Sequence, residues 1–443
     1  MDAFCGIDVA ELLREYGVPG CSVAVLEGGE VVERRGFGVR SVGGGAVTGE
    51  TLFQACSVSK PVSVLGVLRL VERGLLELDG EVDGRLVGWR LPANGGWRPR
   101  VTLRQLLSHT GGLSPGGFGG YPAGAVVLSL VEVLTGSGAA NSAGVRAEGV
   151  PGLGFRYSGG GTTVLQLLLE SVTGRGVTEL LDELVLGPLR MVGSTFGQPL
   201  AKPYRPVAAH GHRAGAVPVA GGWHTYPEQC AAGLWTTPGD LLRYVRGVQV
   251  AWAGRGLLGP ELAREMLRPQ VALGPGGGVV GGLDHVGLGP YLRMVDGEPA
   301  WFGHTGANEG YRCQFLGSVT GGRGAVVMTN GDAGQAVVGR VLRAVAAAHG
   351  WSDLDFGRVY TPARAAEAFA GRYRARDGRA VEIVAAAGGP VLLVAGQEPL
   401  RCFALSEQEL VAEELALAVR LDERGGVRLE QGGTVLEYAR VGE

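Results

Sequence analysis

The feature that most constrains the fold is the position of the strand-like segments, which lie at both ends of roughly the first 350 residues. Near the N-terminus, residues 22–26 and 31–37 flank Glu27-Gly28-Gly29-Glu30, a pattern typical of a β-hairpin. The second strand group is distant in sequence and comprises residues 311–319 and 325–329. The sequence therefore places sheet at both ends of this region.

The middle of this region is predicted to be mostly helical. The segment that begins at Ser57 has an apolar stripe at helical spacing and ends at Arg73-Gly74. Further helical signals cover residues 9–16, 103–107, 162–172, 177–184, 238–250, 260–267 and 336–349. Two glycine-rich segments, Gly111–Gly120 and Gly274–Gly282, are interpreted either as rims of a cleft or as surface connections.

The pattern changes near residues 355–365. Beyond that point short strand-like runs recur with glycine turns between them, at residues 380–385, 391–395, 410–412, 418–421 and 427–430. Regular short strands with turn signals predict a small antiparallel β-barrel. Because 443 residues are too many for one ordinary domain, we predict two domains, residues 1–355 and residues 356–443.

Composition excludes several classes of partner. The net charge is −3 and neither sign forms a long run, so we expect neither nucleic acid nor an acidic membrane surface as a partner. No stretch approaches about 20 uncharged apolar residues, so we expect no membrane span. The start of the chain lacks the basic and apolar segments of a secretory signal, which predicts a cytoplasmic location.

No cofactor or metal site is predicted. The six cysteines are scattered without ligand spacing and are interpreted as free thiols in a reducing compartment. His210, His212 and His224 form the only local histidine group, and no carboxylate or cysteine stands at ligand spacing from them. We interpret these histidines as loop residues.

The first candidate for catalysis is the run Ser57-Val58-Ser59-Lys60. Residues three apart share a helix face, so the hydroxyl of Ser57 and the amine of Lys60 can meet, and an adjacent base activates a serine nucleophile. Lysine is nearly absent, since Lys60 and Lys202 are the two in the chain. A retained lysine suggests a need for an amine that can lose its proton, although two lysines can also survive by chance.

The second candidate is the run from Phe155 to Gly161, which holds Tyr157 and Gly159 directly before a predicted helix. A tyrosine in a tight glycine turn can point its hydroxyl into a cleft and relay protons. The alternative is a capping turn with a half-buried tyrosine. In isolation this segment favours the capping turn.

The third candidate is the turn expected at Gly303-His304-Thr305-Gly306-Ala307, before the predicted strand 311–319. Gly306 would allow a substrate backbone to approach closely, and the N–H of Ala307 is a plausible oxyanion donor. Taken alone, His304 is better interpreted as an ordinary polar loop histidine.

In this order the three segments resemble the S-x-x-K, Y-x-N and H-x-G motifs of the serine β-lactamase and penicillin-binding-protein superfamily, class C-like branch. Two further segments, residues 106–113 and 232–240, resemble its L-L-x-H-T-S-G-L and G-G-L-x-S-T-x-x-D motifs. The resemblance covers roughly residues 8–350. It implies an α+β (α/β) β-lactamase/transpeptidase-like fold: an antiparallel sheet flanked by helices, a helical lobe, and a C-terminal lipocalin-like barrel.

The resemblance also implies roles for single residues. Ser57 is the acylated nucleophile, while Lys60 and Tyr157 share the acid and base work. The N–H groups of Ser57 and Ala307 form the oxyanion hole, and His304 takes the place of a frequent lysine. Gly159, Thr305 and Gly306 contact the substrate, whereas His109 of the fourth motif is interpreted as structural.

Two departures from the motifs bear on the substrate. Gly159 stands where the family often has Asn, which removes an amide that would contact the acyl group. His304 in place of lysine weakens the fixed positive charge offered to a carboxylate. Both argue against efficient β-lactam hydrolysis.

The resemblance favours one activity and leaves others open. Length, barrel and H-x-G motif resemble stand-alone penicillin-binding-protein-type thioesterases, which release and macrocyclise nonribosomal peptides. The substrate would be a peptidyl (thio)ester or a peptide with D-residues, and the partner a carrier protein of a nonribosomal peptide synthetase. The alternatives are a D-aminopeptidase, a carboxylesterase or an inactive binding protein; the last predicts loss of Ser57, Lys60 or Tyr157, and all three are present. The oligomeric state is left open.

Overall fold

The computed structural model describes most of the chain, which contacts divide into two compact units with a boundary after Leu354. The described residues of the first unit are 4, 6–273 and 283–354. Those of the second unit are 282, 367–386, 389–406, 408–412, 417–422, 424–431 and 434–441. The glycine-rich segment predicted at residues 274–282 lies almost wholly outside the described residues.

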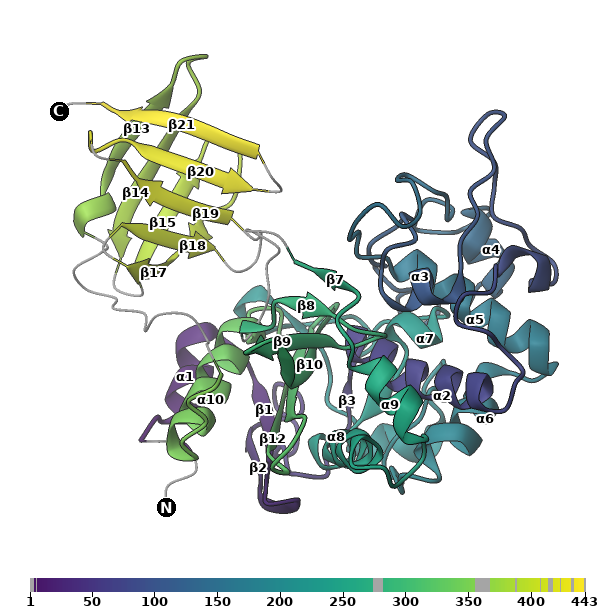
Figure 1. Cartoon of the computed structure of the whole chain (residues 1–443). Coiled ribbons are helices and arrows are strands. Elements are labelled where there is room, and N and C mark those ends of the chain that lie inside the picture. The colour runs from purple at the N-terminus through teal and green to yellow at the C-terminus, as the bar shows by residue number, and fades with distance from the viewer. Residues whose placement is uncertain are drawn as a thin grey trace. The chain divides into compact units, whose positions relative to one another are not determined.

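The first unit contains an eight-stranded antiparallel sheet that joins both ends of the region, as predicted (Figure 1). Its strands, in spatial order, are β2 (Glu30–Gly38), β1 (Gly20–Glu27), β12 (Gly324–Thr329), β11 (Tyr311–Ser318), β10 (Glu298–Asn308), β9 (Tyr291–Val295), β8 (His285–Val286) and β7 (Val271–Ala272). The two ends meet where β1 pairs with β12, from Cys21 opposite Thr329 to Leu26 opposite Gly324. The β1–β2 hairpin is confirmed at its predicted place.

Helices cover both faces of this sheet. α1 (Val9–Tyr16) and α10 (Gly334–Ala348) contact each other on one side, while α8 (Pro238–Trp252) contacts β1, β11 and β12 on the other (Figure 1). Asp8 caps α1 with its carboxylate, and Gly17 ends it in the left-handed conformation. These three helices lie within two residues of their predicted bounds.

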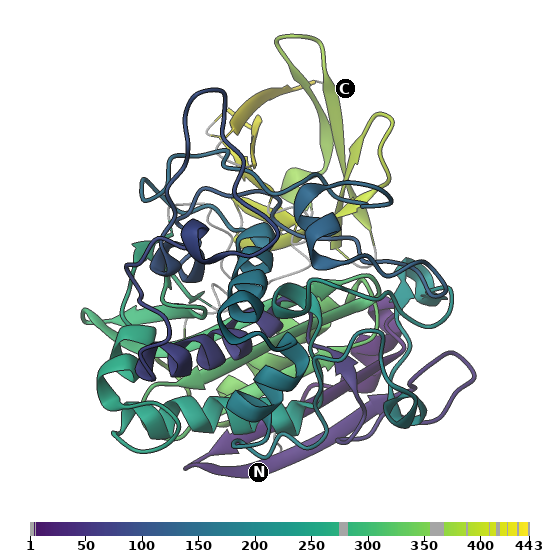
Figure 2. The same ribbon diagram turned by 90° about the vertical axis from the view of Figure 1, so that its right-hand side faces the viewer.

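The remaining helices form a lobe beside the sheet (Figure 2). They are α2 (Ser59–Glu72), α3 (Leu103–Leu107), α4 (Leu130–Thr135), α5 (Gly159–Thr173), α6 (Val177–Leu181), α7 (Gln229–Ala232) and α9 (Pro260–Met266). The helix predicted at 177–184 changes after Leu181 into a wider π-helical turn, Asp182–Leu186. α4 and α7 were not predicted from the sequence.

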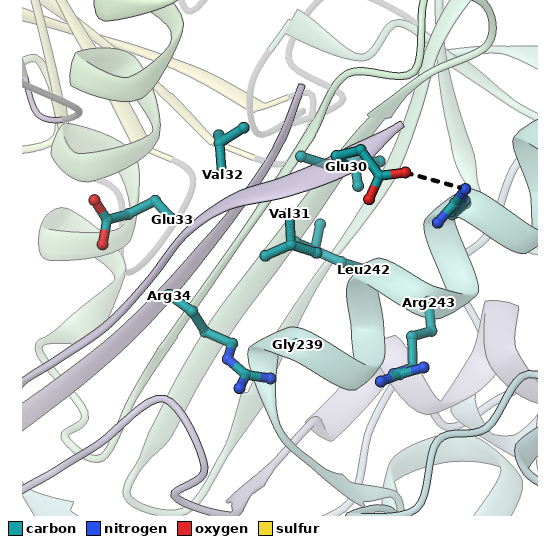
Figure 3. Close-up of a pocket in the computed structure, with 10 residues that line it drawn as sticks. Glu30, Val31, Val32, Glu33, Arg34, Gly239, Leu242 and Arg243 are labelled. Atoms are coloured by element: carbon teal, nitrogen blue, oxygen red, sulfur yellow. Dashed lines mark ion pairs between the residues drawn. The ribbon is translucent and has the colours of Figure 1, made fainter. Parts of the chain in front are cut away.

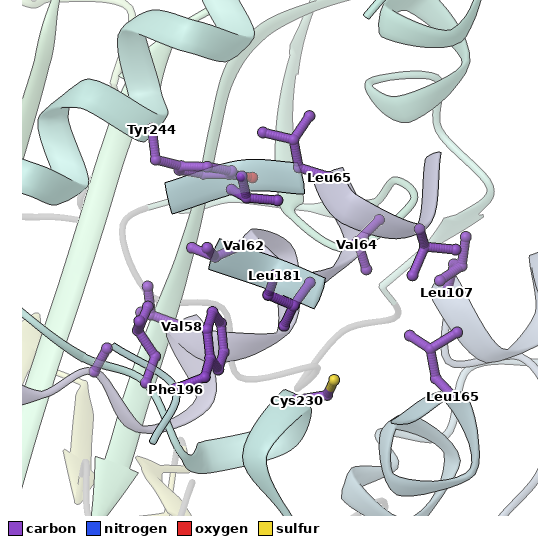
Figure 4. Close-up of a cluster of buried hydrophobic side chains, with 14 of the residues drawn as sticks. Val58, Val62, Val64, Leu65, Leu107, Leu165, Leu181, Phe196, Cys230 and Tyr244 are labelled. Atoms are coloured by element: carbon purple, nitrogen blue, oxygen red, sulfur yellow. The ribbon is translucent and has the colours of Figure 1, made fainter. Parts of the chain in front are cut away.

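α2 is the central helix of the lobe. Every residue from Ser59 to Leu68 is buried, so the helix has no solvent face over this stretch. Its apolar side chains belong to one buried cluster with residues of α3, α5, α6 and α8; Figure 4 shows Val62, Val64 and Leu65 among Leu107, Leu165, Leu181 and Tyr244. This burial fixes the position of the residues at the start of α2, which include Lys60.

The second unit is a curled antiparallel sheet of nine strands. In spatial order they are β16 (Leu400–Arg401), β15 (Gly389–Val394), β14 (Ala380–Ala386), β13 (Gly371–Ala375), β21 (Thr434–Arg440), β20 (Val427–Gln431), β19 (Leu417–Leu421), β18 (Glu409–Ala412) and β17 (Phe403–Ser406). The two outermost strands, β16 and β17, are separated in sequence by Cys402 alone. The run 400–406 therefore pairs with β15 through its first part and with β18 through its second, which curls the sheet toward a barrel.

Candidate active site

Ser57 lies in a short 3-10 turn, η1 (Cys56–Val58), directly before α2. The turn follows β3 (Phe53–Gln54), and Cys56 has a φ of 51°, a conformation that non-glycine residues adopt rarely. Cys56 and Val58 are buried, whereas Ser57 is half-buried. The Ser57 side chain is thus held by buried neighbours on both sides and reaches the surface.

Lys60 lies one turn further along and contacts the Ser57 hydroxyl. Its Nζ is 3.0 Å from Ser57 Oγ and donates a second hydrogen bond to the carbonyl oxygen of Ala231, at 2.8 Å. Lys60 is only 3 % exposed, so the amine can form few contacts with water. The carbonyl of Ala231, in α7, therefore holds the amine against the serine.

Tyr157 lies just before α5, and its ring is close to the same amine. Lys60 Nζ is 5.0 Å from the centre of the Tyr157 ring. Ser158 caps α5, because its Oγ accepts a hydrogen bond from the N–H of Gly161 at 2.7 Å. The cap fixes where the helix starts and hence where Tyr157 lies.

His109 supports Tyr157 from the other side. Its ring centre is 4.6 Å from that of Tyr157, and its Nδ1 accepts a hydrogen bond from the N–H of Ser158 at 3.2 Å. Burial, and then the charge of Lys60, hold the pKa of His109 well below its usual value. The imidazole is therefore neutral at neutral pH and can keep a lone pair on Nδ1, which fits the structural role inferred from the sequence.

His304 lies in strand β10, not in a turn as the sequence suggested. Residues 303–307 pair with β11 throughout, from Gly303 opposite Leu316 to Ala307 opposite Arg312. The turn prediction was wrong because glycines and polar residues interrupt the apolar alternation by which strands are recognised. Here His304 is buried against Tyr157 and Tyr291 instead of facing solvent.

The imidazole of His304 is buried and neutral. Burial, and then the charge of Lys60, lower its pKa to about 3. Its Nδ1 is 2.6 Å from the carbonyl oxygen of the half-buried Thr305, so Nδ1 carries the proton and Nε2 a lone pair. Tyr291 stacks on the ring at 4.9 Å between centres, and the ring of Tyr157 lies at 6.2 Å. His304 therefore adds no positive charge to the site at neutral pH.

Gly306 brings β10 into close contact with the turn that carries Ser57. A Cβ atom at this position would lie 2.6 Å from the carbonyl oxygen of Ala55 and 2.8 Å from Cys56 Cβ. Real Cβ atoms do not approach other atoms so closely, so glycine is required for the contact.

The N–H of Ala307 points away from β11, as the hydrogen-bond pattern of the β10–β11 ladder shows. Val319 N–H donates to the carbonyl of Ala300 at the far end of the β10–β11 ladder. Hydrogen-bonded pairs alternate along an antiparallel ladder, so Ala307 and its opposite residue Arg312 share no ladder hydrogen bond. Ala307 is also exposed, unlike its neighbours in β10. Its N–H is thus not used by the β10–β11 ladder.

Gly159 does not lie open to a substrate, although the sequence had suggested that it does. It is the first residue of α5 and is buried, because the segment around Gly116 lies directly on it: Gly159 N–H donates to the Gly116 carbonyl at 2.9 Å. No open space is left where the amide side chain would be.

Several supporting residues were not found from the sequence. Ala231, Tyr291, Gln54 and Asn308 come from four separate segments, and no local signal marks them. Asn308 Nδ2 donates to Gln54 Oε1 at 2.7 Å and to the carbonyl of Ala232 at 3.1 Å. This amide links the end of β10 to β3 and α7, which carry the neighbours of Ser57 and Lys60.

A separate hollow of about 490 Å³ lies between β2 and α8 (Figure 3). Val31 and Leu242 form its apolar part, and its arginines are paired with acids, as in the ion pair of Arg246 with Glu30 at 3.5 Å. None of the candidate catalytic residues lines it. We therefore do not place the active site there.

Among the described residues no group of three or more His, Cys, Asp or Glu side chains is arranged to hold a metal ion. No described helix is long and apolar enough to cross a membrane. Cys21, Cys56, Cys230 and Cys313 of the first unit are buried thiols.

Comparison with known families decides the assignment. The beta-lactamase family model matches residues 8–349, which span the sheet, the helical lobe and all the candidate residues. The chain belongs to the beta-lactamase family. This confirms the resemblance inferred from the motifs, and the chain is accordingly a serine hydrolase of the β-lactamase and penicillin-binding-protein type.

Individual proteins similar to this beta-lactamase family member include an esterase and two solved structures. Esterase EstB of Burkholderia gladioli is 30% identical over 298 residues, 60% of this chain and 73% of EstB. The octameric penicillin-binding protein homologue from Pyrococcus abyssi has a TM-score of 0.67 at 22% identity, covering 97% of this chain and 98% of the homologue. SurE, also solved with D-Leu, has a TM-score of 0.59 at 23% identity, covering 98% and 97%. The two structures show the same fold.

Proposed function

We propose that Ser57 is acylated by the substrate and that Lys60 accepts its proton. The observation that carries this proposal is the 3.0 Å contact between Lys60 Nζ and Ser57 Oγ, held from behind by the Ala231 carbonyl. To act as a base the amine must be neutral at the moment when it accepts the proton of Ser57. Oγ attacks the substrate carbonyl, a C–O bond forms, and the proton passes to Lys60.

The N–H groups of Ser57 and Ala307 then stabilise the oxyanion of the tetrahedral intermediate. Its collapse breaks the bond to the leaving thiol, alcohol or amine, which takes a proton from Lys60 through Tyr157. His304 stays neutral, is held by Tyr291, and orients Tyr157 through the contact between their rings. Gly306 supports this arrangement by letting β10 approach the turn of Ser57.

We favour a peptidyl thioester or ester as the acyl donor, with the peptide's own amine resolving the acyl-enzyme to give a macrocycle. Two observations support this choice: the fold similarity to SurE extends over both units, and a structure of SurE was solved with D-Leu. The donor would be delivered by a carrier protein of a nonribosomal peptide synthetase. The neutral His304 supports a donor without a carboxylate that needs a fixed cation.

The second candidate is a carboxylesterase, which the 30% identity to Esterase EstB favours. Both activities share the acylation of Ser57 and differ in what attacks the acyl-enzyme. That choice depends on how well the site excludes water and positions the amine. A D-aminopeptidase would use the same first step.

Intact-mass analysis after mixing with a peptidyl N-acetylcysteamine thioester tests the acylation. We expect one acyl adduct on the native chain, none on Ser57→Ala, and acylation slowed at least about 100-fold in Lys60→Met. Lys202→Met is the matched control, because Lys202 is the other lysine and is exposed. An adduct that persists in Ser57→Ala would refute the proposal.

The products separate cyclase from hydrolase. With a linear peptidyl thioester that ends in a D-residue, cyclisation gives a product lighter by one water than the free acid. Free acid alone would contradict the macrocyclase assignment and favour the hydrolytic alternatives, while leaving the acylation of Ser57 intact.

A further inference from the structure

The start of α5 is covered by a segment that comes from the loop after α3. Gly160 N–H donates to the carbonyl of Pro115 at 2.9 Å, as Gly159 does to that of Gly116. A Cβ atom on Gly160 would lie 2.2 Å from the carbonyl oxygen of Ser114. The loop backbone therefore takes the space into which side chains at the first turn of α5 would project.

One side chain of this loop enters the same space. A Cβ atom on Gly159 would lie 3.0 Å from Cε2 of Phe118, close to its 2.9 Å contact with the Gly116 oxygen. Phe118 packs against the buried cluster of Tyr121, Leu128 and Val133, yet remains half-buried itself. The Phe118 ring is thus packed against the protein on one side, and part of it is open to solvent or a ligand.

The loop is fixed at its other end as well. His224 Nδ1 donates to the carbonyl of Gly119 at 2.8 Å, and Tyr121 exchanges backbone hydrogen bonds with Thr225. Tyr226, next in sequence, accepts a hydrogen bond from the N–H of Glu309 at 3.1 Å. Residues 116–121 therefore run from the start of α5 to a segment that contacts the end of β10, and they are anchored at both.

This position is next to the candidate catalytic residues. Tyr157 is two residues before Gly159, and Ala307 is two residues before Glu309. Ser57 and Tyr157 are half-buried, while Gly116, Gly117 and Ala307 are exposed. The 116–121 loop thus lies beside the segment that carries Tyr157, since a Cβ atom on Gly116 would lie 3.7 Å from the Tyr157 carbonyl oxygen.

We propose that Phe118 is a specificity-determining residue, whose ring forms an apolar wall for the side chain that the acyl group carries next to Ser57. The proposal rests on the proposed acylation of Ser57 and names its preferred donor: an acyl residue with an apolar side chain. An aromatic ring has no hydrogen-bonding group to offer an amide but gains from contact with apolar surface. The replacement of an amide at position 159 by this ring changes the recognition from polar to apolar.

Single-turnover acylation of the full chain, followed by intact mass, tests the proposal with two probes: the N-acetylcysteamine thioesters of N-acetyl-D-leucine and N-acetylglycine. We expect the leucyl donor to react faster with the native chain. Phe118→Ala should slow the leucyl donor about 10-fold, the usual effect of losing a contact of one or two methylene groups, and change the glycyl donor less than 2-fold. Phe118→Leu, which keeps an apolar wall, should retain the preference.

Leu153→Ala is the matched control, because Leu153 is an apolar residue of the same lobe that is 80% exposed. It should behave as the native chain with both donors. Equal rate losses for the two donors in Phe118→Ala, or no loss for either, would overturn the specificity role while leaving the acylation proposal standing. Failure of the native chain to be acylated by either donor would overturn both.

Discussion

The variant Gly306→Ala tests whether acylation depends on the position of Ser57 or only on the stability of the sheet. Its added Cβ would meet three atoms at once: Ala55 O and Cys313 Sγ at 2.6 Å and Cys56 Cβ at 2.8 Å. Two of these belong to the residues immediately before Ser57. Because the β10–β11 ladder holds Gly306 from the other side, the turn of Ser57 must shift by several tenths of an ångström.

The expected size of the effect follows from these contacts. Overfilling a well-packed interior costs about 1–3 kcal/mol of unfolding free energy. A 1 Å displacement of reacting groups costs roughly 100-fold in rate, and loss of one oxyanion donor about 100- to 1,000-fold. For a smaller shift that lengthens the distance between Ser57 Oγ and the Ala307 N–H, we expect acylation to slow about 10- to 100-fold.

Gly303→Ala in the same strand is the matched control. Its Cβ would lie 2.5 Å from the carbonyl oxygen of Phe315 and 2.9 Å from Leu316 Cδ2, so it overfills β10 to a similar degree. None of the atoms it meets belongs to the segment that carries Ser57. We expect both variants to unfold at lower temperature and only Gly306→Ala to be acylated slowly.

Thermal unfolding and single-turnover acylation of the two variants provide the comparison. Equal rate losses in Gly303→Ala and Gly306→Ala would mean that destabilisation, not displacement of Ser57, limits acylation. Native rates in a folded Gly306→Ala chain would refute the reasoning, because they would show that the contact of β10 with the Ser57 turn has no catalytic consequence.

Two further predictions concern buried titratable groups. The pKa of His304 is about 3 in the folded chain and 6.5 ordinarily. Between these pH values the unfolded chain binds one more proton, so the free energy of unfolding falls as the pH drops from 6.5 toward 3. In urea unfolding, His304→Gln should lose less of this free energy over the same pH range, and an unchanged loss would contradict the prediction. Burial raises the pKa of Glu228 from 4.5 to about 7, so stability falls as pH rises through that range. Glu228→Gln should therefore be more stable than the native chain by roughly 3 kcal/mol at pH 8 and similar at pH 4; equal stability at pH 8 would refute it.

Helices and strands were predicted correctly where their local residue pattern matches their burial and their ends in the structure. The β1–β2 hairpin has a glycine turn between two apolar runs, and α8 has a proline at its first position with Thr237 as cap. Strand β10 was missed because Pro299, Gly303 and His304 are poor strand residues. These residues are tolerated in β10 because the strand is paired on both sides, with β9 and β11, and because its end forms part of the candidate site.

Contacts in the candidate site could be predicted from the sequence only where the contacting residues are close together in the chain. Ser57 and Lys60 share one turn, so their spacing alone predicts the contact that the structure shows. The Ala231 carbonyl, which holds the same amine, comes from 171 residues away, and no pattern around either residue indicates it. Long-range support of this kind depends on the tertiary fold, which single-sequence patterns do not specify.

Gly159 shows that comparing a motif one residue at a time gives no information on what occupies the space around each residue. From the sequence, glycine in the place of a frequent asparagine signifies the loss of an amide contact. In the structure the space is occupied, since the Gly116 backbone and the Phe118 ring lie where that side chain would be. Glycine at 159 and the 116–121 loop therefore depend on each other: a side chain would displace the loop, and without the loop nothing would require the glycine. If Phe118 has the specificity role proposed above, the glycine and the ring, 41 positions apart, together change the recognition of the acyl group from polar to apolar.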